Sequence, residues 1–169
     1  MNEWGGQPLP LSATCYHQGR LRVRLSGAQP AVAAAMTRLG GEIVAEGDAF
    51  WSKVRDHTHP FFGGDVAAGT PLWRLSVKST APYTDLGGEQ LIEWGGALRW
   101  LAAGDRTDPQ KVRRWTAEHG GHATLFRAPG KDASVFQPLD ATLAGLHRKL
   151  KAVFDPHGIL NRGRMLADS

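Results

Sequence analysis

The sequence is poor in residues that cross-link a chain or anchor it in a membrane. It has one cysteine in 169 residues, Cys15, so no intrachain disulfide can form, and it has no Cys/His set of the kind that holds zinc or an iron–sulfur cluster. No run approaches the roughly 20 apolar residues of a membrane span, and residues 1–6 lack the features of a signal peptide. We therefore expect a cytoplasmic, reducing setting and a buried, structural Cys15, since no base lies near it in the sequence.

The sequence also lacks clusters of like charge. The formal net charge is +4, but the basic residues are scattered and form no Lys/Arg run like that of a nucleic-acid-binding tail. The sequence has no paired aromatic RNA-binding motif, and its glycine pairs lie where helices are expected to end. We expect no nucleic-acid partner. The remaining alternative is a freestanding module that binds a small ligand or RNA.

What the chain does contain suits one compact core. Hydrophobic residues make up 41% of the 169 residues, which predicts a single domain over residues 1–169. The 21 glycines and 10 prolines indicate frequent turns. Apolar periodicity predicts strands and helices in turn, and the turn residues His17-Gln18-Gly19 predict a hairpin between the first two strands. The expected strands are 9–16, 20–25, 42–46, 72–79, 90–103 and 123–127, and the segment 90–103 is either one strand or two joined at Gly95-Gly96. The expected helices are 30–39, a helix that is capped by Asp48 and ends before Pro60, 109–119 with its cap at Asp108, and 139–154.

A concealed repeat organises these elements. Leu21–Gly47 and Leu98–Arg127 share the order strand, glycine, proline-started helix, Gly-Gly, strand. Two such units with antiparallel strands predict an α+β, ferredoxin-like fold, in which helices cover one face of an antiparallel sheet. The other face would be free to cover a ligand or a partner.

The C-terminal run VFDPHGILNRGRM (residues 153–165) resembles the FDPxGIxNPG(K/R) ending of FAD-linked oxidases of the vanillyl-alcohol oxidase type. Further segments are similar to the FAD-binding E subunit of bacterial glycolate oxidase: NEWGGQPLP (2–10), LWRLS (72–76), EWGGALRWL (93–101) and GGHATLFR (120–127). The resemblance covers essentially the whole chain, but only the C-terminal cap half of that subunit.

This resemblance implies a cap domain that helps FAD oxidise glycolate or a similar 2-hydroxy acid to the 2-oxo acid. It implies that FAD is bound mainly by an upstream N-terminal domain, so we expect the isolated chain to bind no cofactor and to be inactive. The implied partners are that FAD domain, a homologous flavin subunit and an iron–sulfur subunit, in a complex at the inner face of the cytoplasmic membrane. An exposed sheet face would allow the fragment to form a homodimer. The alternative is an assembly domain without a catalytic role.

By the same resemblance, residues 154–166 form a flavin-site segment. Asn161 is expected to approach the flavin, Gly163 to allow close passage of the backbone, and Arg164 to meet an anionic group. Arg162 stands where the family usually has proline. The alternative is that residues 155–163 are only a helix stop and a tail.

Other candidates come from residue type and position. Arg74 could face a pocket and bind the carboxylate of a hydroxy acid, or it could be an edge-exposed arginine. His57 and His59 have the spacing of two metal ligands, but no third ligand stands out, so we expect a histidine pair at a helix end and no metal. The sequence does not identify a catalytic residue.

The six tryptophans are many for this length. Core packing is expected for Trp94, Trp100 and Trp115, whereas the positions of Trp4, Trp51 and Trp73 are left open. Any tryptophan that is exposed would mark a face that meets a partner.

Overall fold

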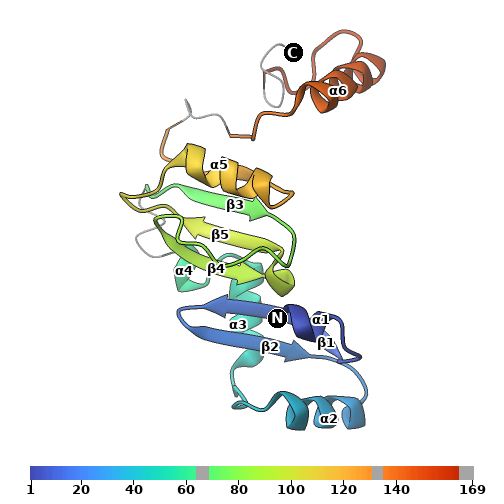
Figure 1. The fold of residues 1–169 in the computed structure, drawn as a ribbon, viewed down its shortest axis with the longest axis vertical. Coiled ribbons are helices and arrows are strands. Elements are labelled where there is room, and N and C mark those ends of the chain that lie inside the picture. The colour runs from blue at the N-terminus through green and yellow to red at the C-terminus, as the bar shows by residue number, and fades with distance from the viewer. Residues whose placement is uncertain (64–68, 131–134, 164–169) are drawn as a thin grey trace. The chain divides into compact units, whose positions relative to one another are not determined.

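The computed structural model describes residues 1–63, 69–130 and 135–163. The chain divides into two compact units, here called the sheet unit (residues 1–135) and the helical unit (residues 136–169). The helical unit contains α6 (Ala141–Phe154). The sheet unit contains, in chain order (Figure 1), α1 (Asn2–Gly5), β1 (Leu11–His17), β2 (Arg20–Leu25), α2 (Gln29–Leu39), α3 (Gly47–Arg55), α4 (Pro60–Gly63), β3 (Leu72–Ser76), β4 (Glu89–Glu93), the 3-10 turn η2 (Trp94–Gly96), β5 (Leu98–Ala102), α5 (Pro109–Glu118) and β6 (His122–Arg127).

The strands form one six-stranded sheet in the order β2-β1-β4-β5-β3-β6, with every neighbouring pair antiparallel. This confirms the predicted α+β class with an antiparallel sheet. The β1–β2 hairpin is closed by Gln18 and Gly19, whose φ angles of 48° and 73° are those of a two-residue hairpin turn. The predicted strand 90–103 is two strands, because η2 reverses the chain and Glu93 pairs with Leu98.

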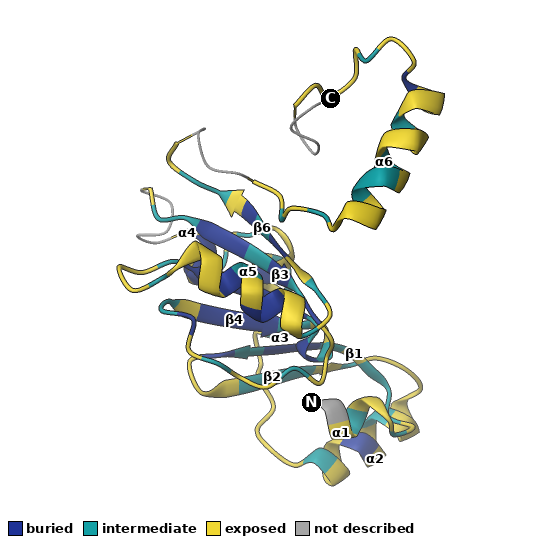
Figure 2. Cartoon of the chain, turned by 45° about the horizontal axis from the view of Figure 1, so that its top comes forward, coloured by how far each residue is buried: buried dark blue, intermediate teal, exposed yellow. Residues whose placement is uncertain are grey.

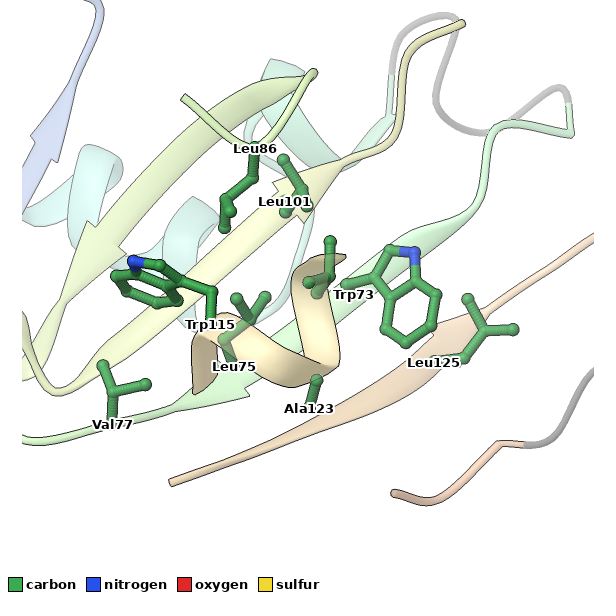
Figure 3. Close-up of a cluster of buried hydrophobic side chains, with 9 residues drawn as sticks. Trp73, Leu75, Val77, Leu86, Leu101, Trp115, Ala123 and Leu125 are labelled. Carbon is green, nitrogen blue, oxygen red and sulfur yellow. The ribbon is translucent and has the colours of Figure 1, made fainter. Parts of the chain in front are cut away.

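Helices cover both faces of the sheet, which corrects the expectation of helices on one face. Consecutive residues of β5 are buried, so each face needs its own cover. On the α5 face, a cluster packs beneath α5 (Figure 3): Trp73, Leu75, Val77, Leu86, Leu101, Val112, Trp115, Ala123 and Leu125. On the other face, called the α3 face, residues of the sheet and of α4 form a second cluster, joined by Phe50 and Trp51 of α3: Cys15, Phe61, Phe62, Leu72, Leu91, Leu98, Trp100 and Ala102. Figure 2 views the sheet from the side that α5 covers.

Only the second predicted repeat is formed, as β5–α5–β6. The expected strand 42–46 is not a strand, and Ile43 is 80% exposed. Its apolar residues occupy consecutive positions, so in a strand they would point to both faces of the sheet and could not all be buried on one. Strands β3 to β6 do have the split order β4-β5-β3-β6, but residues 77–88 join β3 to β4 as a loop and not as a helix.

The helix ends follow the sequence closely, with two differences. Asp108 caps α5, since its side chain accepts a hydrogen bond from the Gln110 N–H at 2.8 Å. Asp48 does not cap α3 as expected, because the N-cap is Glu46 and Asp48 lies in the first turn. Residues 61 and 62 lie outside every expected helix, but in the structure they belong to α4 and are buried in the α3-face core.

The helical unit is organised around the two ends of α6. The Asp140 side chain accepts a hydrogen bond from the Leu143 N–H at 2.9 Å and caps the start of the helix. At the other end, the Asp155 carboxylate accepts hydrogen bonds from the N–H groups of Ile159 and Leu160 at 2.9 and 3.0 Å. The predicted helix 139–154 is thus confirmed to within two residues. No helix within the described ranges is long and apolar enough to cross a membrane.

Candidate functional site

A groove of about 1010 Å³ opens on the α3 face of the sheet unit. Its lining residues come mainly from β1, α3, β3, β4, η2, β5 and β6. The side chains that matter for its chemistry are His57, Arg74, Glu93, Trp94, Trp100 and Phe126. The groove therefore combines aromatic side chains with charged ones, among them the Arg74 guanidinium and the Glu93 carboxylate.

Arg74 lies in this groove and not at a sheet edge. Strand β3 is paired with β5 and β6, so Arg74 lies opposite Trp100 on one side and Thr124 on the other. Its guanidinium carbon is 5.9 Å from the centre of the Trp94 ring, and no residue in the described part of the chain forms a hydrogen bond or ion pair with it. The edge-exposed interpretation is therefore wrong, and the guanidinium is available to a ligand.

Glu93 is a groove residue that the sequence analysis missed. Its Oε2 accepts a hydrogen bond from the Trp100 Nε1–H at 2.8 Å. Burial raises the pKa of the Glu93 carboxyl above its ordinary value, while the Trp100 hydrogen bond and the Arg74 charge act in the opposite direction. The signal was present, because Glu93 shares a strand face with buried Leu91, where an apolar residue would be usual.

His57 and His59 do not converge on one site. His57 lines the groove and stacks on Phe62 with ring centres 4.3 Å apart. His59 lines a separate hollow of about 470 Å³, and its Nδ1 accepts the Phe61 N–H at 3.2 Å. Burial lowers the pKa of both imidazoles. Within the described residues, no three His, Cys, Asp or Glu side chains are arranged to hold a metal ion.

Trp94 is exposed, contrary to the prediction that it packs in the core. It is 67% exposed because it begins η2 with a φ of 51°, which turns it away from the sheet. Trp100 and Trp115 are buried as predicted, and Trp73 is buried as well. Trp94 thus adds an exposed aromatic surface to the groove.

Cys15 is fully buried in the α3-face core, which confirms the predicted burial. Burial raises the pKa of its thiol to about 12. We expect about a thousandfold less thiolate at a given pH than for a thiol with the ordinary pKa of 9.0. Iodoacetamide should therefore leave the native protein unmodified at mildly alkaline pH and label it fully in urea, as measured by intact mass. Rapid labelling of the native protein would contradict the burial of Cys15.

The C-terminal candidates lie in the turn that follows α6 in the helical unit. Asn161 and Gly163 are exposed and have φ angles of 47° and 65°, a region that asparagine and glycine tolerate best. Arg162 takes part in the turn, since its Nε donates to the Gly158 carbonyl at 2.7 Å. Arg164 lies outside the described residues. The left-handed turn leaves the Asn161 amide open to a partner, and contact with a flavin remains a prediction.

Comparison with known proteins gives one strong similarity. The chain is 46% identical over 166 residues to the glycolate oxidase subunit GlcE of Escherichia coli (strain K12). The match covers 98% of this chain and 44% of that subunit, so the chain spans less than half the length of the relative. No family model and no solved structure matches the chain significantly.

Proposed function

Because this chain is similar over 98% of its length to a glycolate oxidase subunit, we propose that it is the C-terminal cap domain of such a subunit. In this role it helps FAD to oxidise glycolate or a similar 2-hydroxy acid to the 2-oxo acid. The observation that carries the proposal is the 46% identity to that subunit. When bound, FAD would accept the electrons of the oxidation, while the residues of this chain would bind and orient the substrate.

The groove has the composition that this role requires. Arg74 would bind the substrate carboxylate through two parallel N–H···O hydrogen bonds, for which a guanidinium without a protein partner is suited. The aromatic walls would displace water from the bound acid. Because the match covers 44% of that subunit, the proposal assigns most FAD contacts to the rest of the subunit, with Asn161, Gly163 and Arg164 approaching the flavin.

The proposed partners follow from the same similarity. They are the N-terminal FAD domain, a homologous flavin subunit and an iron–sulfur subunit, in a cytoplasmic complex at the inner face of the membrane. The second candidate function is subunit assembly without a catalytic role. It is favoured by the 67% exposure of Trp94 and by the exposed apolar residues of α6, because large apolar surfaces usually meet a partner.

Reconstitution tests the proposal. The chain alone should neither quench FAD fluorescence nor support bleaching of the flavin by glycolate, whereas a mixture with the rest of the subunit should do both. Arg74→Ala should slow glycolate-dependent bleaching about 100-fold, because it removes the charged partner of the carboxylate. Arg114→Ala is the matched control, since Arg114 is exposed on α5 and outside the groove. Bleaching is followed by flavin absorbance.

Two outcomes would count against the proposal. Tight FAD binding by the chain alone would mean that the main cofactor site lies within these 169 residues. Full glycolate turnover by both Arg74→Ala and Asn161→Ala would remove their site roles and favour assembly.

A further inference from the structure

The groove also contains the carboxylate of Glu93, which takes no part in the carboxylate binding proposed for Arg74. Trp100 links the two residues. Its backbone pairs with that of Arg74 across β3 and β5, and its indole N–H donates to Glu93 at 2.8 Å. The two charged side chains therefore face one groove from neighbouring positions around the same tryptophan.

Arg74 and Glu93 do not neutralise one another in an ion pair. Arg74 lowers the pKa of Glu93 through its positive charge, but the two side chains form no ion pair. Trp100 is the only hydrogen-bond donor to the Glu93 carboxylate among the described residues, and it occupies Oε2. Glu93 Oε1 is left to accept a hydrogen bond from a ligand. A half-buried carboxylate with one free oxygen is costly unless something donates to it.

We propose that Arg74 and Glu93 form a two-point site for 2-hydroxy acids, in which the guanidinium binds the carboxylate and Glu93 Oε1 accepts a hydrogen bond from the 2-hydroxyl. The inference rests on the proposed function and deepens it, because it names the residue that recognises the hydroxyl group. It adds a specificity-determining residue to a site that otherwise binds any small carboxylate.

The charge of Glu93 makes this recognition selective. The negative charge of Glu93 repels every carboxylate that approaches Arg74. Only an acid with a hydroxyl hydrogen recovers that cost through a charge-assisted hydrogen bond. A plain carboxylate or a 2-oxo acid has no such hydrogen. The other charged or titratable side chains that line the groove, Arg24, Asp48, Arg55 and His57, come from β2, from α3 and from the residues after α3.

The test is an NMR titration of the 169-residue chain, with the Trp100 indole N–H as the reporter because it is bonded directly to Glu93. Glycolate is the probe, and acetate is the matched probe without the hydroxyl. Glycolate should shift the resonance with a Kd about tenfold lower than that of acetate, the size expected for a hydrogen bond to a charged group. Arg74→Ala should weaken the binding of both anions, which separates the carboxylate contact from the hydroxyl contact.

Two variants at Glu93 complete the test. Glu93→Ala should abolish the preference for glycolate over acetate. Glu93→Gln keeps an acceptor for the Trp100 indole and should preserve the fold while reducing the preference. Equal affinity for glycolate and acetate, unchanged in Glu93→Gln, would overturn the role of Glu93 and leave that of Arg74 intact. No response to either anion would overturn the two-point site and the carboxylate role of Arg74 together, whereas the similarity-based FAD role is judged by the reconstitution.

Discussion

Replacing Gly121 by alanine should destabilise the sheet unit by about 3 kcal/mol, as expected when a side chain is forced into a filled space. Gly121 precedes β6 directly, where β6 pairs with β3. A Cβ atom at this position would collide with the carbonyl oxygen of Ser76 and would lie 2.8 Å from the Val77 Cα. Both obstacles are backbone atoms, so the strands must separate to make room. The β3–β6 pairing, which flanks Arg74, should weaken first.

Gly47→Ala is the matched control for this prediction. Gly47 begins α3, and a Cβ there would have no heavy atom within 4 Å. Alanine should be neutral or slightly stabilising there, by up to about 1 kcal/mol. Urea unfolding followed by tryptophan fluorescence measures both variants, and since all six tryptophans lie in the sheet unit, the signal reports that unit alone. If both variants unfold at the same urea concentration, the close approach of residue 121 to β3 is wrong.

Trp100→Ala should destabilise the sheet unit by about 3–5 kcal/mol. Trp100 is 3% exposed and packs edge-to-face against Phe62 at 5.4 Å. Its removal leaves a large cavity in the α3-face core and takes away the hydrogen-bond donor of half-buried Glu93. The two losses act in the same direction, so this substitution should be among the most damaging in the chain.

Trp94→Ala serves as the control for Trp100→Ala, because it removes the same side chain from the same groove. Trp94 is 67% exposed, so its loss should change the free energy of unfolding by no more than about 0.5 kcal/mol. Urea unfolding is followed for both variants by circular dichroism, since each has lost one fluorophore. A large effect of Trp94→Ala would mean that this side chain packs in the fold and is not free for a partner.

Local features of the structure were predictable because their causes lie close together in the sequence. The hairpin at Gln18-Gly19 follows from a turn whose residues accept positive φ, and α5 follows from the cap at Asp108 and the apolar spacing behind it. The prediction of a strand at 42–46 was wrong because the segment has residues that favour strands but no alternation that would place its apolar side chains on one face. The core position expected for Trp94 failed because η2 turns it outward.

The candidate site was predictable only in part. Arg74 was singled out as a charged residue inside an apolar strand, but its place in the groove depends on β3 lying between β5 and β6. Glu93 was missed because its place in the site depends on its hydrogen bond with Trp100, seven residues later. That contact forms across a hairpin whose turn the sequence left undecided. Asn161 and Gly163 were identified by resemblance alone, and their open turn is compatible with that role without testing it.

The sequence by itself determined the α+β class, the β1–β2 hairpin, the helices α5 and α6, and the similarity to a glycolate oxidase subunit, because these depend on short-range spacing or on motifs. Only the tertiary structure decided that helices cover both faces of the sheet, that β3 is an interior strand, and that Arg74 and Glu93 share one groove. The physical reason is that strand order is set by pairing between residues far apart in the chain. Side chains from β3, β4 and β5 become neighbours only after that pairing has formed.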